Sequence, residues 1–458
     1  MKATRIISVL FIFIVYACTN TLQNEDIPIL SISGGKVRGA LTDSSQVVVF
    51  KGIPYAAPPI GDLRWKKPQE VIPWDTIMIA DKFGNIAMQY DFEPGCFWGD
   101  EFYWMGKPKK SEDCLFLNVW APRVAVGNAN ANLPVAVYIH GGAFQQGYGN
   151  EISMDGDAWA QRGVVMLTIN YRVGIEGFLS HPLLSSESED GTSGNYGIYD
   201  QLAALQWVKK NIAQFGGNPN DITVFGQSAG ARSVKLLVSS PLAKGLVSKA
   251  IILSGGGIST SAESFIPTDV LEKEGRDMLD LYGLKTLDQM RKATSKELKR
   301  AGEKYDRVIG NHTLRPHLDG VLITEDFTTA VNNNHIADIP YMIGYTADDN
   351  ASFKQGDIER FAATRNTLSK QPTYCYLFAR PLPGDNAGAF HTGELWYVFH
   401  TLQRSWRPFI SADYELSDRI VDYFTNFVKY GNPSPDNRLD QWMPYTKDNP
   451  HVQVLQIK

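Results

Sequence analysis

The chain of 458 residues is 43% hydrophobic and 20% charged, a composition that excludes disordered and fibrous proteins and is typical of a globular fold. Its formal net charge of -5 is not concentrated in long runs of one sign, so we expect neither nucleic acid nor an anionic membrane surface as a partner. Because no linker, internal repeat or low-complexity tract divides the chain, we expect one large domain over residues 26–458.

The N-terminus has the features of an export signal over residues 1–17. Two basic residues precede an apolar run over residues 6–15, which is too short to span a bilayer as a stable helix. The following Val15-Tyr16-Ala17-Cys18 resembles a bacterial lipobox, in which Cys18 is acylated after cleavage, although Tyr16 fits that motif poorly. We therefore expect an exported protein, either a periplasmic or cell-envelope lipoprotein anchored through Cys18 or a secreted protein.

Short apolar runs recur along the chain, with helical patterns between them. They are Val135–Ile139, Val164–Ile169, Ile222–Phe225, Ala250–Leu253, Pro340–Ile343 and Tyr374–Phe378. Near-continuous hydrophobicity over four to eight residues is typical of strands that are buried on both faces. The alternation of strands and helices therefore predicts an α/β fold with a mostly parallel central sheet flanked by helices.

Three further patterns complete the expected fold. Apolar residues three and four positions apart predict an amphipathic helix over Ile198–Phe215. Three N-terminal segments broken by turn residues, Leu30–Ser33, Val37–Gly39 and Val47–Lys51, predict antiparallel strands. The charged helical pattern over Val270–Tyr305 predicts a reduced helical cap over the strand ends.

The segment Gly226-Gln227-Ser228-Ala229-Gly230 has a serine between two glycines, where a strand-like run gives way to a helical one. The pattern G-x-S-x-G is typical of a nucleophile elbow, in which a strained turn displays the serine hydroxyl at the end of a strand. Five residues alone are a weak signal, but the strand before and the helix after supply the context that the motif requires. We therefore expect Ser228 to be a nucleophile.

A serine nucleophile needs a base, and in this fold class the acid and then the histidine follow the serine along the chain. Histidines that follow the run Pro340–Ile343 are His391, His400 and His451. His391 lies in a loop after Tyr374–Phe378 and can reach back over the sheet edge. His400 lies in an apolar run and His451 lies near the terminus, so we expect His391 to be the base.

The acid is expected in the turn after Pro340–Ile343, because functional side chains gather at strand ends in such sheets. Asp348 and Asp349 both occupy this turn. One of the two can cap a helix while the other orients the histidine. These residues alone leave the choice between the two aspartates open.

A third requirement is a set of amide donors for the oxyanion. The run Val135–Ile139 ends in His140-Gly141-Gly142-Ala143-Phe144, which matches the HGGG-type element that supplies backbone N–H groups, and Ala229 supplies another after the nucleophile. Phosphate binding is disfavoured because the chain lacks G-x-G-x-x-G and a Walker lysine. No spacing of cysteine and histidine resembles a metal site, and serine chemistry needs no cofactor.

From about residue 35 to about residue 445, the chain resembles the type-B carboxylesterase and cholinesterase family of α/β-hydrolases. Several long strings carry the resemblance: FKGIPYAAPPIGDLRW, SEDCLFLNVWAP, HGGAF, NYRVGIEGFL, GNYGIYDQLAALQWVKKNIAQFGGNP, GQSAG and GAFHTGELWYVF. The resemblance implies Ser228 as nucleophile, His391 as base, and an oxyanion hole formed by the amides of Gly142, Ala143 and Ala229. It also favours Asp349 over Asp348 as the acid, since Asp349 aligns with the family's usual glutamate.

The cysteines depart from the family pattern. Cys96 and Cys114 bracket a loop, and export permits a disulfide. In the family, the cysteine of SEDCLFLN pairs with one that directly precedes a glutamine, where this chain has Met88-Gln89. We therefore expect Cys96 to be the partner of Cys114. Cys375 lies in a strand-like run and is expected to be a buried apolar residue.

The resemblance also bears on four charged residues and on the position before the nucleophile. It implies two structural ion pairs, Arg64 with Glu112 and Arg172 with Asp200, so these charges do not indicate chemistry. Cholinesterases have glutamate directly before the nucleophile. Gln227 removes that negative charge, which argues against choline esters as substrates.

Together these patterns predict an exported serine hydrolase that cleaves small-molecule carboxylic esters through an acyl-enzyme intermediate. A lipase is a weaker alternative, because the predicted cap is too charged for an apolar lid. A non-catalytic adhesion or binding module is the alternative from another class, since some family members have lost the serine. The intact serine, histidine and glycine-rich loop argue against that alternative.

Overall fold

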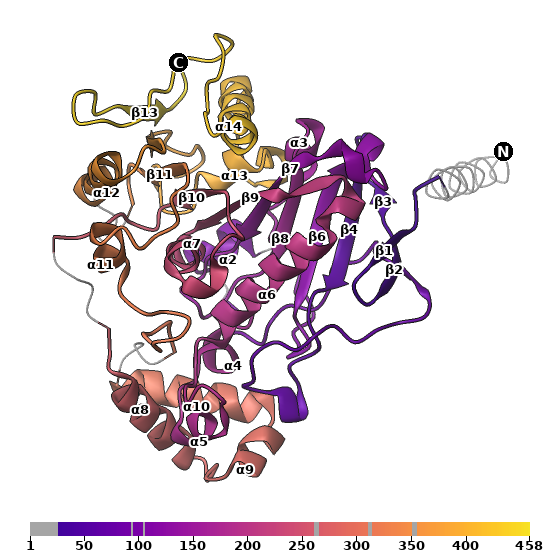
Figure 1. Cartoon of the computed structure of the whole chain (residues 1–458), viewed down its shortest axis with the longest axis vertical. Helices are drawn as coiled ribbons and strands as arrows, with labels where there is room; N and C mark the ends of the chain where they lie inside the picture. Colours follow the sequence, from indigo (N-terminus) through magenta and orange to yellow (C-terminus); the bar gives the residue numbers. More distant parts are fainter. Residues whose placement is uncertain (1–25, 93–94, 104–105, 261–264, 310–313, 350–354) are drawn as a thin grey trace, which may run out of the picture.

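One large β-sheet forms the centre of the computed structural model (Figure 1), which describes residues 26–92, 95–103, 106–260, 265–309, 314–349 and 355–458. The expected export signal over residues 1–17 and Cys18 lie outside the described residues. Within this described part of the chain, no helix combines the length and the apolar character needed to cross a membrane.

The described strands of the main sheet follow the order β13-β12-β11-β10-β9-β7-β8-β6-β4-β3. Their bounds are β3 (Ala40–Leu41), β4 (Val47–Pro54), β6 (Phe116–Pro122), β7 (Leu133–Ile139), β8 (Val165–Ile169), β9 (Gly217–Gln227), β10 (Lys249–Leu253), β11 (Tyr341–Thr346), β12 (Thr373–Phe378) and β13 (Val452–Leu455). The strands from β8 to β13 in this order pair in parallel. The six apolar runs are β7 to β12, so the prediction of a mostly parallel α/β sheet is confirmed.

The N-terminal strands are antiparallel, as predicted. β3, β4, β6 and β8 pair antiparallel in succession at one end of the main sheet. A small separate sheet is formed by β1 (Leu30–Ile32), β2 (Gly35–Arg38) and β5 (Ile77–Ile79). In it, β1 pairs antiparallel with β2, whereas β5 pairs in parallel with β2.

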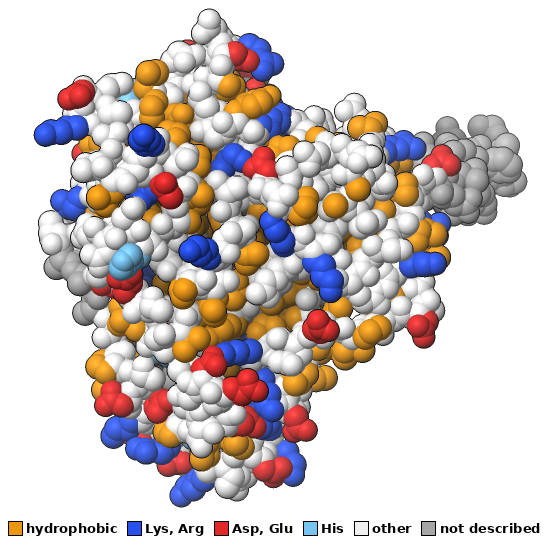
Figure 2. All heavy atoms as spheres, viewed as in Figure 1, with side chains coloured by type: hydrophobic (Ala, Val, Ile, Leu, Met, Phe, Trp, Pro, Cys, Tyr) orange, Lys and Arg blue, Asp and Glu red, His pale blue; other side chains and the backbone are white. Residues whose placement is uncertain are grey.

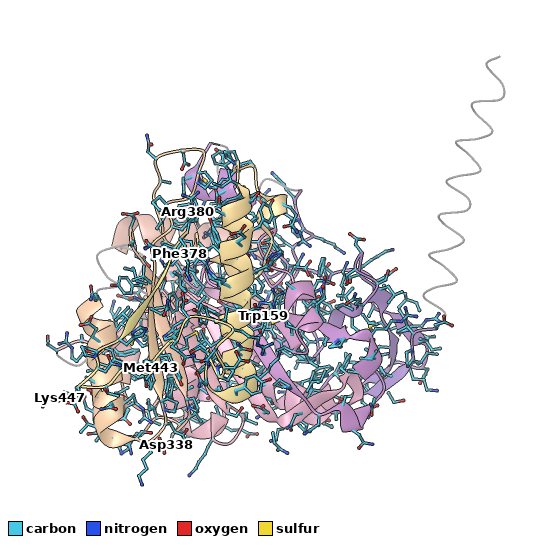
Figure 3. The ribbon with its side chains drawn as sticks, turned by 90° about the horizontal axis from the view of Figure 1, so that it is seen from above. Trp159, Asp338, Phe378, Arg380, Met443 and Lys447 are labelled. Carbon is cyan, nitrogen blue, oxygen red and sulfur yellow. The ribbon has the colours of Figure 1, made fainter. Side chains whose placement is uncertain are left out.

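Side chains of the central strands alternate between two cores, one on each face of the sheet. In β7, Val137 and Ile139 belong to the core that includes α6 and α7, whereas Tyr138 belongs to the core that includes α3 and α14. Figure 3 shows α14 running across this second face of the sheet, beside Trp159. The ring of Trp159 lies 6.4 Å from that of Phe424. The bounds of these helices are α3 (Asp157–Gln161), α6 (Tyr196–Asn211), α7 (Ala229–Ser239) and α14 (Ser411–Tyr430).

The remaining helices are short or lie at the edges of the sheet. They are α2 (Phe97–Phe102), α4 (Gly174–Phe178), α5 (Pro182–Glu187), α11 (Phe327–Asn332), α12 (Gln355–Leu368) and α13 (Leu395–Val398). Single 3-10 turns occupy Gly61–Leu63, Arg123–Ala125, Ala129–Ala131, Ile212–Phe215, Pro241–Ala243 and Leu402–Arg404. The predicted amphipathic helix over Ile198–Phe215 is therefore α6 together with the 3-10 turn that follows it.

The predicted helical insertion is present as α8 (Thr268–Asp280), α9 (Leu287–Lys292) and α10 (Ser295–Ile309). These helices gather with α5 at the lower end of the view in Figure 1, and Figure 2 shows charged side chains of both signs over the same region. Arg64 joins the insertion to the body of the protein, because its Nη1 donates hydrogen bonds to the carbonyl groups of Met290 at 3.0 Å and Ala293 at 2.7 Å.

Both ion pairs implied by the family resemblance are present. The guanidinium of Arg64 donates to both carboxylate oxygens of Glu112 at 2.6 Å. The guanidinium of Arg172 donates to both carboxylate oxygens of Asp200 at 2.8 and 2.7 Å, and both side chains are buried. Bidentate geometry of this kind offsets the cost of burying the two charges.

The predicted disulfide between Cys96 and Cys114 is wrong, because both thiols are free. Cys96 caps the N-terminus of α2, where its Sγ accepts a hydrogen bond from the amide of Gly99 at 3.3 Å. Cys114 is buried and lines a small cavity with Met88. Cys114 thus faces the position where the family places its partner, and that position holds a methionine. Cys375 is buried and free, as expected.

Helix α7 packs so closely against β7 and β9 that two positions admit only glycine. A Cβ atom on Gly230 would lie 2.0 Å from the carbonyl oxygen of Ile139. A Cβ atom on Gly226 would lie 2.5 Å from the carbonyl carbon of Gly230. Both obstacles are backbone atoms, so a larger residue can be accommodated only if the helix moves away from the sheet.

We expect Gly230→Ala to lower the free energy of unfolding by about 1 to 3 kcal/mol, because the added methyl group overpacks this contact. Chemical denaturation measures the change. Gly356→Ala is the matched control, since nothing lies within 4 Å of a Cβ at Gly356 in α12. Alanine there should stabilise the helix by about 0.4 to 1 kcal/mol. Equal effects of the two substitutions would contradict the packing argument.

Candidate active site

Ser228 lies at the turn between β9 and α7, in a backbone conformation that residues other than glycine rarely adopt. Its φ is 57° and its ψ is -121°. The Ser228 amide donates to the carbonyl oxygen of Leu253 at 2.9 Å, and the Ser228 carbonyl accepts from the amide of Arg232 at 3.0 Å. Such a strained turn persists only where the surrounding contacts fix it, and here it presents the Ser228 hydroxyl to a pocket.

His391 and Asp349 are brought together from two loops that follow neighbouring strands. The Nδ1–H of His391 donates a hydrogen bond to Oδ1 of Asp349 at 2.7 Å. The side chain of Asp349 is 2% exposed and that of His391 is 12% exposed. A buried carboxylate in this position fixes the ring tautomer and leaves Nε2 as the acceptor.

Asp348 faces a different partner. Its Oδ2 accepts a hydrogen bond from the amide of Ala389 at 2.7 Å, and its own amide donates to the carbonyl oxygen of Ala389 at 3.0 Å. Gly388 lies against the same carboxylate, because a Cβ there would be 2.3 Å from Oδ2. Asp348 therefore holds the loop that carries His391, while Asp349 contacts the ring itself.

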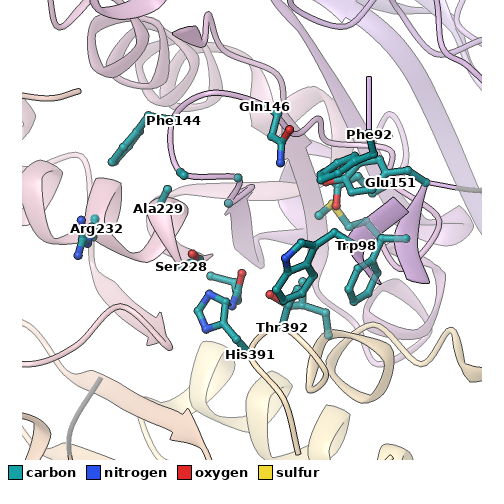
Figure 4. A pocket seen from close by; sticks show the side chains of 18 of the residues that line it. Phe92, Trp98, Phe144, Gln146, Glu151, Ser228, Ala229, Arg232, His391 and Thr392 are labelled. Carbon is teal, nitrogen blue, oxygen red and sulfur yellow. The ribbon is translucent and has the colours of Figure 1, made fainter. Parts of the chain in front are cut away.

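Ser228 and His391 line the same pocket, and Figure 4 shows their side chains at its floor. The side-chain nitrogen Nε2 of Gln227 lies 3.2 Å from Nε2 of His391. With the imidazole Nε2 acting as the acceptor, the side-chain NH₂ of Gln227 donates to it. The residue directly before the serine thus touches the imidazole, so the difference between glutamine and glutamate at this position changes the charge next to the ring.

The loop after β7 brings the expected amide groups to the pocket. Gly142, Ala143 and Phe144 have positive φ values of 103°, 55° and 64°. Gly142, Ala143 and Ala229 all line the pocket beside Ser228. Within the described ranges, none of the three amides donates a hydrogen bond to another part of the protein. Free backbone donors around a nucleophile can stabilise a developing oxyanion.

The pocket has a volume of about 590 Å³, and its walls differ strongly in character. One wall is aromatic and comes from α2 and nearby segments. The ring of Trp98 lies 6.4 Å from that of His391, and the ring of Phe102 lies 5.5 Å from that of Trp396. The opposite wall contains Phe144 and Arg232, which Figure 4 shows on the other side of Ser228.

A buried carboxyl group, Glu151, lies in the aromatic wall. Its Oε1 accepts hydrogen bonds from the hydroxyl of Tyr103 at 2.7 Å and from the amide of Tyr148 at 3.2 Å. Burial raises the pKa of Glu151 to about 7, although both hydrogen bonds oppose that shift. Near neutral pH this wall can therefore hold either a neutral acid or a negative charge.

A second buried carboxyl group, Glu394, lies behind His391. Its Oε1 accepts a hydrogen bond from the hydroxyl of Ser254 at 3.2 Å. Burial raises the pKa of Glu394 to about 7, while His391 opposes and Asp349 adds to the shift. The electrostatic field at the imidazole therefore depends on the protonation of Glu394.

Several residues of this site were not anticipated from the sequence. Arg232 follows Ser228 by one helical turn, and Glu394 follows His391 by three residues, so helical spacing could have indicated both. Trp98 lies in the short helix α2 and Glu151 lies in an irregular segment, and neither is marked by a periodic signal in the sequence. No group of three or more possible metal ligands occurs among the described residues.

The fold defines a class of protein, the α/β-hydrolases, and solved structures share this fold. A structure entitled thermophilic PNB esterase superposes with a TM-score of 0.80 at 28% identity and covers 94% of this chain and 96% of that one. Another PNB esterase superposes with a TM-score of 0.79 at 29% identity and covers 93% of this chain and 95% of that one.

Sequence comparison identifies the family within this class. The chain belongs to the carboxylesterase family, whose model matches residues 26–370 and 356–458. Para-nitrobenzyl esterase of Bacillus subtilis (strain 168) is 36% identical over 486 residues, with 93% of this chain and 94% of that protein covered. Fumonisin B1 esterase of Sphingopyxis macrogoltabida is 38% identical over 325 residues, which cover 70% of this chain and 56% of that esterase. The protein is a carboxylic ester hydrolase.

The burial of Glu394 predicts a pH dependence of stability. The unfolded chain ionises this carboxyl near pH 4.5, whereas the folded protein retains the proton to about pH 7. The free energy of unfolding therefore falls as pH rises through this window and is constant above it. Glu394→Gln keeps the neutral form at every pH. Between pH 4.5 and pH 7.5, we expect the free energy of unfolding of the variant to rise relative to that of wild type by on the order of 3 kcal/mol.

Urea denaturation at the two pH values measures this difference. Glu70→Gln removes an exposed carboxyl group and serves as the control, with the same difference from wild type at both pH values. A Glu394→Gln protein whose difference from wild type did not change with pH would show that Glu394 is already ionised in the folded state.

Proposed function

We propose that the protein cleaves carboxylic esters through an acyl-enzyme intermediate, with Ser228 as nucleophile, His391 as general base and Asp349 as the acid that orients it. The 2.7 Å contact between His391 and Asp349, in the pocket that also contains Ser228, is the observation that carries this proposal. The strained backbone of Ser228 and the free amides beside it supply additional support.

In the proposed reaction, Ser228 Oγ attacks the ester carbonyl carbon while His391 Nε2 accepts the hydroxyl proton. The amides of Gly142, Ala143 and Ala229 bind the oxyanion of the tetrahedral intermediate. His391 then gives its proton to the leaving alcohol, which breaks the ester bond and leaves an acyl group on Ser228. Water, activated by His391, releases the acid, so one ester and one water yield one acid and one alcohol.

The positions of the side chains suggest how an ester is oriented. The leaving alcohol must lie within reach of His391 Nε2, and the aromatic wall with Trp98 lies on that side. The acyl group stays bonded to Ser228 and extends away from His391, toward Phe144 and Arg232 (Figure 4). We refer to the wall with Trp98 and Glu151 as the alcohol side and to the wall with Phe144 and Arg232 as the acyl side.

A fluorophosphonate probe and a 1-naphthyl ester test the proposed function together. We expect wild type to be labelled and to release naphthol, and Ser228→Ala to do neither. We expect Asp349→Asn to lower kcat by roughly 10⁴-fold, because asparagine cannot hold the imidazole in the required tautomer. Steady-state kinetics at pH 8 measure the effect.

Asp348→Asn is the matched control for Asp349→Asn. Asparagine at this position can still accept the hydrogen bond from the amide of Ala389, so kcat should stay within a few-fold of wild type. If the two substitutions had equal effects, Asp349 would not be distinguished as the acid of the triad. If Ser228→Ala retained labelling, the assignment of the nucleophile would fail.

We also propose that the protein is exported and that residues 1–17 are its signal peptide. This proposal depends on the sequence alone, because a short apolar run with two preceding basic residues is typical of such signals. Mass spectrometry of the mature protein from a bacterial host tests it. A lipoprotein begins at a lipid-modified Cys18, whereas a secreted protein begins at an unmodified residue. An intact, unprocessed N-terminus would contradict export.

A further inference from the structure

The acyl side of the pocket does not end at the catalytic residues. Phe144, Arg232 and Arg315 line both the 590 Å³ pocket and a second cavity of about 420 Å³. The second cavity also contains Lys235 and His317. An acyl group bonded to Ser228 and extending away from His391 therefore passes two arginine side chains before it reaches this second space.

The second cavity is lined by three basic side chains, Arg232, Arg315 and Lys235. Its described lining contains no aspartate or glutamate. Lys235 is buried, and its Nζ donates to the carbonyl oxygen of Gly257 at 3.0 Å and lies 4.7 Å from the ring of Phe327. Positive charges grouped in a concave surface create a field that attracts an anion.

Arg232 is the member of this group that is most available to a ligand. Its side chain is exposed, and no hydrogen bond or ion pair joins its guanidinium to any described residue. Arg172 and Arg407, by contrast, are buried and form bidentate pairs with carboxylates. A guanidinium with no such partner in the described part of the chain, at the junction of two cavities, can donate two parallel hydrogen bonds to a carboxylate.

The opposite end of the pocket disfavours an anion. Glu151 lies in the alcohol side, and its pKa of about 7 means that it carries substantial negative charge at and above neutral pH. The two ends of the pocket thus differ in the sign of the charge that they carry. An ester with a negative charge is therefore favoured with that charge on its acid part and not on its alcohol part.

We propose that the acyl side is a carboxylate-binding subsite, so that the preferred substrates are monoesters of dicarboxylic acids whose free carboxylate binds Arg232. The inference rests on the proposed ester hydrolysis and adds the class of acid to it. The free carboxylate takes no part in the bond changes. Cleavage of the ester by water gives the dicarboxylate and a neutral alcohol.

A pair of matched substrates tests the subsite. 1-Naphthyl hemiglutarate carries a terminal carboxylate where 1-naphthyl pentanoate carries a methyl group, and the leaving group is the same. We expect wild type to prefer the charged ester in kcat/KM by about ten- to a hundredfold, as a charge-assisted pair of hydrogen bonds should give. Sodium chloride at 1 M should reduce this preference, because salt screens exposed charges.

Substitution of Arg232 should remove the preference. We expect Arg232→Gln to lower the ratio of the two kcat/KM values by tenfold or more, and Arg232→Lys to lower it less, because lysine keeps the charge but loses the bidentate geometry. Arg123→Gln is the matched control. It removes one exposed positive charge in a 3-10 turn that lines neither cavity, so the ratio should stay at the wild-type value.

The outcomes separate this inference from the proposed function. Equal kcat/KM values for both esters in wild type, with fluorophosphonate labelling intact, would overturn the subsite and leave the esterase mechanism standing. An unchanged ratio in Arg232→Gln would also overturn it. Failure to cleave either ester, without labelling, would refute the proposed function itself. Competitive inhibition by glutarate in wild type that is weakened in Arg232→Gln would support the subsite independently of turnover.

Discussion

The close approach of α7 to the sheet is the contact on which the rest of the site depends. Gly230 lies against the carbonyl oxygen of Ile139, which leaves no space for a side chain. This contact forces the chain to turn within one residue, and that residue is Ser228, with its φ of 57°. The same turn presents Ser228 to the pocket that the amides of the loop after β7 also line. The proposed nucleophile and the proposed oxyanion donors therefore depend on one packing constraint.

Much of this arrangement could be predicted because it depends on local sequence. The buried strands have continuous apolar runs, and the glycines around Ser228 are required by the close packing. The choice of Asp349 over Asp348 needed the family resemblance, since both residues follow the same strand. The disulfide prediction failed because two cysteines that bracket a loop do not necessarily point toward each other. Cys96 caps a helix, while Cys114 faces Met88 in a small cavity.

The walls of the pocket could not be predicted in the same way. Trp98 comes from the short helix α2 and Glu151 from an irregular segment, and only the folded chain brings them near His391 and Tyr103. Arg315 lies more than eighty positions after Ser228 and lines the same pocket. The residues that line the pocket thus come from helices and loops far apart in the sequence, and their proximity depends on tertiary contacts and not on periodic patterns. The fold and the proposed chemistry can be inferred from motifs, whereas the substrate class can be inferred only from the assembled cavity.

Buried carboxyl groups connect the stability of this protein with its chemistry. Burial raises the pKa of Glu151 and Glu394 to about 7 and that of Glu176 to about 8. Each such group lowers the stability of the folded state as the pH rises, because the unfolded chain ionises it more easily. Of these groups, Glu151 lines the pocket and Glu394 follows His391 by three residues. The stability of the folded state and the charge around the proposed base therefore change over the same range of pH.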